Sequence, residues 1–482
     1  MSILIIDIGS SSTRAMLFDE DLSIVPDGIA SRSHQIGVNG DGAAFLDAVA
    51  LQKEVESCLD EILQHPRAVE IRAVGVDTLV GNMMGIDSDG HPLTPVFTYA
   101  DTRSAEDVDI LSEKIDLEAT HQRTGCPHHT AYRPGQLHWL RRSDPQTFEQ
   151  VAQWTDFASY LYGQWFGRAA PCSYSVASWS GMLNRASLTW DAEWLNVLGM
   201  QVGQFSPLAD FDEYMSGLAP DDANRWPQLA ECPFFLAIGD GAAANVGIGA
   251  TDASTMALTV GTTGAVRRIV AGTLPQVPGG LWSYRVDAAH HLVGGATSEG
   301  GNIYQWVTDH IQLDDDAESA LLGRPADEHG LTFIPLLAGE RAPGWATHAT
   351  GAIIGLRMGT TGIDILQAAL EGVAIRLRII ADQLTQGEAP TIIASGGALL
   401  ASPAFTQILA NAFGRAIHLA DIPESTARGV AMMVQSRLDG RHPAAYPSYS
   451  VIEPSPDAAA KMIRAQERQI AWYERIIRDG FF

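Results

Sequence analysis

The chain has 482 residues, of which 46% are hydrophobic and 18% charged, an ordinary composition for a globular protein with two or three domains. Lys and Arg total 31 against 57 Asp and Glu, so the formal net charge is −26. This charge repels nucleic acid and anionic lipid and argues against both as partners. A phosphorylated ligand must therefore be held by local donors, such as backbone N–H groups or Mg²⁺.

The cysteines and the N-terminus indicate the compartment. Cys58, Cys126, Cys172 and Cys232 are scattered without a CxxC pair, so we expect neither a disulfide framework nor a zinc site. The N-terminus is apolar for only four residues and lacks a basic region, unlike a signal peptide. No stretch approaches the roughly 20 apolar residues of a membrane span. We expect a cytoplasmic protein.

The first predicted unit is a β-hairpin. Residues 3–6 and 14–18 are apolar runs, separated by Asp7 and a turn of small residues that includes Ser10, Ser11 and Ser12. A carboxylate at the end of a strand can hold Mg²⁺, while N–H groups and hydroxyls of such a turn can meet phosphate oxygens. The alternative is a plain tight hairpin with a capping aspartate.

The rest of the first half alternates helix and strand. We expect a helix over residues 45–63 and a buried strand over 71–76. The Trp- and Tyr-rich stretch of residues 100–235 is interpreted as a cap that shapes a ligand pocket. The alternative, preferred for most of its aromatic residues, is that they form core.

Asp240 is the candidate catalytic base. It follows an apolar strand over residues 234–238 and precedes an Ala/Gly-rich helix start. The helix N-terminus lowers the pKa of this carboxylate, whereas desolvation and nearby phosphates raise it. A base in phosphoryl transfer need only accept a hydroxyl proton late, so a carboxylate suffices. The alternative is a helix-capping aspartate.

The hairpin pattern returns in the second half. Residues 256–259 lead into Gly261, Thr262, Thr263 and Gly264, and a second apolar run covers 265–270. Two facing turns of this kind could clamp one phosphate chain. A long helix over 363–384 and a strand over 391–394 follow, so both halves are predicted to be α/β layers. We place the boundary near residue 245, giving domains 1–245 and 246–482 with the cleft between them.

A third element follows the strand at 391–394. Gly396 and Gly397 could let a flat adenine approach the backbone, and the next helix carries Gln407 and Asn411. On its own, an ordinary strand-to-helix turn is the preferred interpretation. Neither a GxxxxGK[ST] loop nor a GxGxxG motif after a strand is present.

The order of these motifs resembles the FGGY carbohydrate kinases of the sugar kinase, actin and heat-shock ATPase superfamily. The resemblance implies an α/β fold of two actin-like (ribonuclease H-like) domains, the first binding sugar and the second nucleotide. It implies that Asp7 and Asp240 help to hold Mg²⁺ and that Asp240 is also the catalytic base. The loop Gly261–Thr263 and the pair Gly396–Gly397 would contact phosphate and adenosine, respectively.

Within that family, the chain is most similar to the gluconokinases and next to the xylulokinases. Four segments resemble those of gluconokinases, and residues 174–178 and 337–343 are two of them. Residues 98–104 resemble TWADNRS and residues 124–129 resemble TGTPxH, which implies that Asp101, Arg103 and His129 contact the substrate. Related kinases carry a Met-His-Gly or Met-His-Ser segment where this chain has residues 80–82. Asn82 is the candidate replacement for the missing histidine in binding the substrate. The later residues Glu340, Arg341 and Pro343 are interpreted as structural.

The sequence thus predicts transfer of the γ-phosphoryl group of ATP to a hydroxyl of a sugar or sugar acid. Gluconate is the first expected substrate, and a ketopentose such as xylulose, or a polyol, is the second. A non-catalytic sugar sensor or an actin-like ATPase is the distant alternative. The expected partners are small molecules, without nucleic acid or membrane, and a homodimer is left open.

Overall fold

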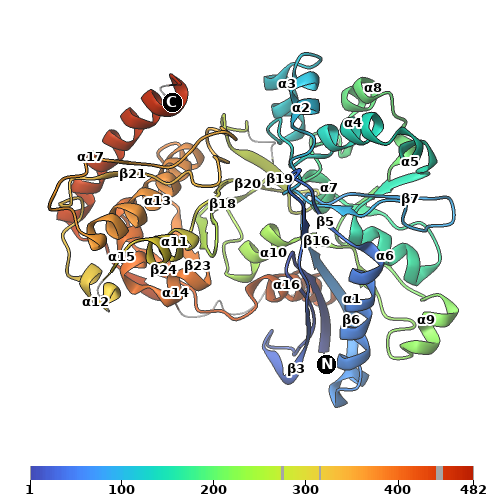
Figure 1. The fold of residues 1–482 in the computed structure, drawn as a ribbon. Coiled ribbons are helices and arrows are strands. Elements are labelled where there is room, and N and C mark those ends of the chain that lie inside the picture. The colour runs from blue at the N-terminus through green and yellow to red at the C-terminus, as the bar shows by residue number, and fades with distance from the viewer. Residues whose placement is uncertain (1, 273–275, 314–315, 441–448, 481–482) are drawn as a thin grey trace.

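The protein folds into two lobes that meet at a central junction (Figure 1). The computed structural model describes residues 2–272, 276–313, 316–440 and 449–480. Each lobe is built on a seven-stranded mixed sheet covered by helices. Among the described residues, no helix combines the length and the apolar character needed to cross a membrane.

The first sheet lies in the N-terminal lobe. Its strands are, in spatial order, β14 (Tyr214–Met215), β15 (Phe234–Phe235), β6 (Ile71–Thr78), β1 (Ser2–Ile8), β2 (Ser12–Phe18) and β3 (Ile24–Ser33), with β16 (Ile238–Gly239) also on β6. Its helices include α1 (Ala48–Ile62), α6 (Phe157–Phe166), α7 (Tyr174–Ser178) and α10 (Asp240–Gly247). Strands β1 and β2 are antiparallel, whereas β1 and β6 are parallel. The first predicted hairpin and strand are thereby confirmed, and the predicted helix forms but begins at Ala48, because residues 44–46 belong to strand β5 (Ala44–Leu46).

The second sheet repeats this arrangement. Its strands are, in spatial order, β19 (Trp282–Arg285), β20 (His290–Thr297), β18 (Gly264–Ala271), β17 (Thr255–Val260), β23 (Thr391–Ser395), β24 (Ile417–Leu419) and β25 (Ser450–Ile452). Its helices include α11 (Asn302–His310), α13 (Gly362–Thr385), α15 (Pro403–Phe413) and α17 (Pro456–Tyr473). Thr259 pairs with Ser395 across β17 and β23, as Asp7 pairs with Asp77 across β1 and β6. The predicted duplication is therefore present at the level of strand register.

Most of the aromatic residues between 100 and 235 form core. Trp154, Trp165 and Trp226 are buried in the apolar cluster beneath the first sheet. This agrees with the alternative interpretation of that stretch. Trp179, at the end of α7, is different because it faces the junction between the lobes.

One helix from late in the chain crosses to the first lobe. Helix α16 (Ser425–Asp439) packs against α10 and against β1 and β6 (Figure 1). Its Val430 and Val434 lie over Gly75, where a Cβ would come within 2.7 and 2.9 Å of them. A division of the chain at residue 245 does not separate the lobes completely, because this helix buries its apolar face against the first sheet.

Candidate active site

A cavity of about 140 Å³ lies between the lobes and contains Asp240. The first lobe contributes Val80, Gly81, Tyr99, Ala131, Tyr132, Trp179 and Asp240 to its wall. The second lobe contributes Thr263, Ala265, Arg267, Trp282, Tyr284, Ala296, Arg341 and Trp345. The two sides touch where the ring of Trp179 stacks on that of Tyr284, with 3.7 Å between ring centroids. A ligand in this cavity would therefore contact both lobes.

Asp240 is the first residue of α10, directly after β16, as the sequence predicts. Its Oδ1 accepts a hydrogen bond from the Gly241 amide at 2.6 Å. Burial raises the pKa of Asp240 to about 6, although the Arg267 charge and the Gly241 amide act in the opposite direction. Of the two opposing effects expected from the sequence, desolvation is the larger. The carboxylate is thus poised to accept a proton near neutral pH.

With Asp240 as the base that the sequence predicts, this pKa sets the expected pH dependence of turnover. Asp240 must be ionised to act as a base, so kcat/KM for the acceptor should fall about tenfold per pH unit below a pH of about 6. The measurement is kcat/KM with saturating Mg-ATP over a range from about pH 4.5 to 8. A profile that stays flat to the acidic end of this range would contradict the assignment of Asp240 as the base.

Asp7 and Asp77 form a pair of carboxyl groups at the ends of adjacent parallel strands. Asp7 accepts a hydrogen bond from Arg14 at 3.3 Å. Asp77 is fully buried, and neither of its carboxyl oxygens has a hydrogen-bond partner among the described residues. Burial and then the Asp7 charge raise the pKa of Asp77 well above its usual range, and burial also raises the pKa of Asp7. Two neighbouring carboxyl groups whose ionisation burial opposes fit a divalent cation such as Mg²⁺, which would offset their charge.

The two predicted phosphate loops are both closed by a backbone hydrogen bond, which spans three residues in the first loop and two in the second. The Gly9 amide donates to the Ser12 carbonyl at 2.9 Å, and the Gly261 amide donates to the Thr263 carbonyl at 3.0 Å. Ser10 and Ser12 are half-buried, whereas Ser11, Thr262 and Thr263 are exposed. The start of α11 holds the second loop, because the Gly301 amide donates to the Gly261 carbonyl at 2.7 Å. Both turns present polar groups to solvent at the strand ends that carry Asp7 and Thr259.

The predicted adenosine segment lies beside the second loop. Gly396 has φ of +117°, and a Cβ there would come within 2.2 Å of the Val260 carbonyl. Glycine is required at this close approach, and Gly397 follows as the first residue of α14 (Gly397–Ala401). The structure therefore brings Gly396 and Gly397 next to Gly261.

Gln407 and Asn411 have partners in the C-terminal lobe. The Gln407 amide donates to Asn411 at 3.2 Å and to the Glu453 carbonyl at 2.9 Å. Asn411 also accepts from the Ser455 amide at 2.9 Å. These contacts hold the segment before α17, and a role of either side chain at adenosine stays a prediction.

The expected substrate residues of the first lobe lie at different places relative to the cavity. Asp101 and Arg103 form an ion pair at 2.6 Å, and the Arg103 guanidinium lies 4.2 Å from the Trp139 ring centre. Neither residue is part of the cavity wall. His129 packs against the wall residue Trp345, with 5.1 Å between ring centroids. His129 Nδ1 accepts from the Ala131 amide at 3.1 Å, which leaves Nε2–H as a donor.

Burial, together with the Arg341 charge, lowers the pKa of His129 to about 4. The ring is therefore neutral at physiological pH. It can donate one hydrogen bond, but it does not contribute a positive charge.

Asn82 is buried behind the cavity wall. Its Nδ2 donates to the Leu79 carbonyl at 2.7 Å, and its Oδ1 accepts from the Phe157 amide at 2.8 Å. With both ends of the amide bonded to backbone, its contacts are structural. The cavity instead meets the two residues before it, Val80 and Gly81.

Two family models cover most of the chain. The N-terminal domain of the FGGY family of carbohydrate kinases matches residues 2–247, and the C-terminal domain matches residues 256–435. The chain belongs to the FGGY family of carbohydrate kinases. It is thus a phosphotransferase with an alcohol group as acceptor, and kinases of this family use ATP.

Relatives of this FGGY kinase differ in their acceptors. The gluconokinase of Bacillus subtilis (strain 168) is 28% identical over 453 residues, covering 89% of this chain and 86% of that protein. The glycerol kinase of Thermus brockianus is 29% identical over 360 residues, covering 71% and 70%. A xylulose kinase of Lactobacillus acidophilus has a TM-score of 0.92 at 24% identity, with 98% of each chain covered. A gluconate kinase of Lactobacillus acidophilus has a TM-score of 0.91 at 24% identity, with 99% of each covered.

Sequence reasoning missed several residues of the kinase cavity. Arg341 was interpreted as structural, yet its side chain lines the cavity. Glu340 beside it does have structural contacts, because it is buried, pairs with Arg376 and accepts from the Tyr473 hydroxyl at 2.6 Å. Sequence reasoning also missed Arg267 in the cavity wall and Asp77, which lies outside the wall beside Asp7. A charged residue inside an apolar strand pattern was the available signal for Asp77.

Asp77 should matter for Mg²⁺ binding by this kinase. We expect Asp77→Asn to weaken Mg²⁺ affinity by about 10- to 100-fold. Because burial raises the pKa of Asp77, its ionised form is disfavoured in the fold, so the variant should be at least as stable as wild type in EDTA at neutral pH. The Mg²⁺ dependence of ADP release and thermal unfolding in EDTA measure the two effects. An unchanged Mg²⁺ requirement would count against a metal role for Asp77. The control is Asp221→Asn, at an exposed position, which should leave the Mg²⁺ requirement unchanged.

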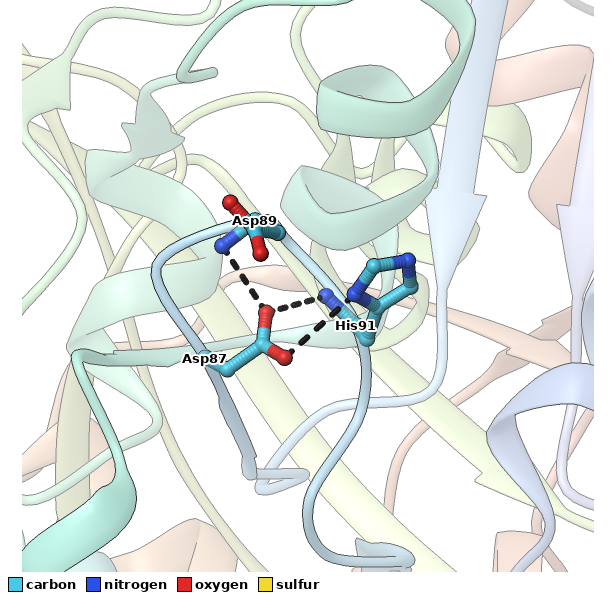
Figure 2. Close-up of side chains that lie close together, drawn as sticks. All are labelled: Asp87, Asp89 and His91. Atoms are coloured by element: carbon cyan, nitrogen blue, oxygen red, sulfur yellow. Dashed lines mark hydrogen bonds and ion pairs between the residues drawn. The ribbon is translucent and has the colours of Figure 1, made fainter.

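Two other groups of acidic and histidine side chains have local structural explanations. Figure 2 shows Asp87 accepting from the backbone amides of Asp89 at 2.9 Å and His91 at 2.8 Å, which closes the turn after β7 (Met84–Ile86).

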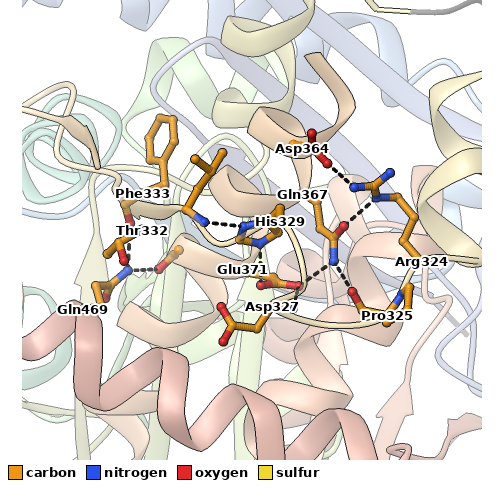
Figure 3. Close-up of polar contacts among 12 residues, drawn as sticks. Arg324, Pro325, Asp327, His329, Thr332, Phe333, Asp364, Gln367, Glu371 and Gln469 are labelled. Carbon is orange, nitrogen blue, oxygen red and sulfur yellow. Dashed lines mark hydrogen bonds and ion pairs between the residues drawn. The ribbon is translucent and has the colours of Figure 1, made fainter. Parts of the chain in front are cut away.

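Figure 3 shows the second group beside α13, where Glu371 pairs with His329 at 3.0 Å. Asp327 there pairs with Arg468. These contacts join α13 and α17, so this group also stabilises the fold.

Proposed function

We propose that this kinase transfers the γ-phosphoryl group of ATP to a hydroxyl of a sugar acid, with gluconate as the first expected substrate. The observation that carries the proposal is the half-buried Asp240, which lies in a cavity walled by both lobes and has a pKa raised to about 6. The 28% identity to a gluconokinase supports the choice of acceptor. Two arginines, Arg267 and Arg341, in the same wall support an anionic substrate.

The residues suggest a division of labour. The acceptor hydroxyl would lie against Asp240, which takes its proton as the new bond to the γ-phosphorus forms and the bond from that phosphorus to the bridging oxygen breaks, releasing ADP. Amides and hydroxyls of the turns at Ser10–Ser12 and Gly261–Thr263 would hold the phosphate oxygens. Asp7 and Asp77 would hold Mg²⁺, which neutralises phosphate charge when bound. In this proposal the first lobe binds sugar and supplies the base, and the second binds nucleotide.

Closing the lobes over the substrates would exclude water, which otherwise competes as the acceptor. The stacked pair Trp179 and Tyr284 joins the lobes at the cavity and would report such a movement. We place the kinase in the cytoplasm, where ATP and Mg²⁺ are abundant.

The test is ADP release with Mg-ATP and a panel of sugar acids, ketopentoses, pentitols and glycerol. Turnover that is fastest on gluconate or another sugar acid would support the proposal. Fastest turnover on xylulose or another neutral member would keep the kinase and Asp240 but overturn the acidic substrate. Release of ADP without any acceptor would favour an ATPase.

A further inference from the structure

We infer that Arg341 binds the carboxylate of the acceptor and is the residue by which this kinase separates sugar acids from neutral sugars. The inference rests on the proposed function of the cavity as the sugar site.

Arg341 is a cation without a hydrogen-bond or ion-pair partner in the part of the chain that the structure describes. It lines the same cavity as Asp240, and its guanidinium lies 5.9 Å from the ring centre of Tyr99. Among the described residues, no carboxylate or other acceptor forms a hydrogen bond or ion pair with this side chain. In a chain of net charge −26, a half-buried arginine that faces a cavity and pairs with no carboxylate among the described residues is conspicuous. Desolvating the guanidinium is costly unless an anion fills the cavity beside it.

The backbone holds this arginine in place. Glu340 before it is fixed by Arg376 and by the Tyr473 hydroxyl. The Arg341 carbonyl accepts from the Trp345 amide at 2.7 Å, and the Trp345 indole donates to the Gly280 carbonyl at 2.7 Å. The guanidinium is therefore presented from a rigid segment, which favours a planar, two-bond contact with a carboxylate.

The cavity has more free donors than acceptors. Trp179 Nε1 and Arg267 Nε are buried and lack hydrogen-bond partners among the described residues. Of the described residues that line the wall, Asp240 is the one carboxylate. This donor excess suits an anion rather than a neutral polyol, whose hydroxyls need acceptors as well as donors.

Two anions could use these donors, the transferred phosphoryl group and the acceptor carboxylate. Arg267 is suited to the phosphoryl group, because it bonds Thr259 Oγ1 at 3.3 Å, at the foot of the second phosphate loop, and its charge acts on Asp240. Arg341 instead neighbours Tyr99 and His129, which belong to the segments that resemble sugar-binding motifs. This placement assigns the carboxylate to Arg341.

The test compares Arg341→Met with wild type on gluconate and on the neutral acceptor that wild type uses best. We expect kcat/KM for gluconate to fall on the order of 10²-fold, while the value for the neutral acceptor and the KM for ATP stay within about twofold. Arg341→Lys should recover part of the loss, because it restores the charge but not the two-bond geometry. Arg357→Met, which removes the same charge from an exposed position, is the matched control and should behave as wild type.

Equal losses on acidic and neutral acceptors, or a raised KM for ATP, would assign Arg341 to phosphate or to structure and overturn the inference. Unfolding temperatures of all variants identify any folding defect. Calorimetric binding of gluconate and of the neutral acceptor to Arg341→Lys then shows whether this variant still prefers the acidic one. Wild-type turnover on gluconate that Arg341→Met leaves unchanged overturns this inference alone. Wild-type turnover restricted to neutral sugars overturns the proposed acidic substrate together with it.

Discussion

Replacing Asp240 with Asn should lower kcat by roughly 10² to 10⁴-fold, because the acceptor hydroxyl then lacks a base. Burial raises the pKa of Asp240 to about 6 in the folded protein, above its pKa in the unfolded chain. The ionised carboxylate therefore lowers the free energy of unfolding, and this loss grows as the pH rises from the unfolded pKa to the folded pKa. Asn carries no charge, and the variant should unfold at the same or a higher temperature at pH values near 8.

The two readouts for Asp240→Asn are ADP release with saturating substrates and thermal unfolding. Nucleotide binding, measured by calorimetry with Mg-ADP, should remain close to wild type, since the loops that would hold phosphate are unchanged. Near-normal kcat in a folded variant would remove Asp240 from the chemistry. Loss of nucleotide binding instead would show that Asp240 acts mainly through the metal.

Replacing Gly247 with Ala should have the largest effect on stability. A Cβ at this position would lie 1.7 Å from the Ser425 carbonyl oxygen and 3.0 Å from the Gly429 amide, so α10 and α16 could no longer cross in contact. Gly429 is equally constrained, since its Cβ would lie 1.9 Å from the Ala243 carbonyl oxygen. We expect the free energy of unfolding to fall by about 3 kcal/mol.

The same substitution should lower kcat, because α10 carries Asp240 at its first residue and must shift when α16 is pushed away. Denaturant unfolding and ADP release measure the two effects. Gly323→Ala is the matched control, because a Cβ at Gly323 meets no atom within 4 Å. If both alanine variants unfold at the same denaturant concentration, the helix contact is not as tight as the structure indicates.

Local patterns predicted the elements that carry the chemistry. A Gly/Ser/Thr turn between two apolar runs specifies a hairpin, and both hairpins form with the expected strands. The placement of Asp240 followed from an apolar strand ending before an Ala/Gly run. The long helix predicted over 363–384 is observed as α13.

Contacts between distant segments could not be predicted in the same way. Chain order does not reveal that α16 returns to the first sheet, because its apolar face would suit either sheet. Asn82 looked available for substrate, but its partner Phe157 lies 75 residues away in the sequence. Arg341 follows Glu340 directly in the sequence, but the fold places Arg341 in the cavity wall and Glu340 in a buried contact with Tyr473.

The most direct test of the account is ³¹P NMR of wild-type kinase with Mg-ATP and gluconate, run beside Asp240→Asn. The account predicts that the γ-phosphate signal of ATP is replaced by that of a phosphate monoester of gluconate, in equal amount to ADP, and that Asp240→Asn forms almost none. Inorganic phosphate as the main product, or the same monoester formed at similar rate by Asp240→Asn, would contradict it.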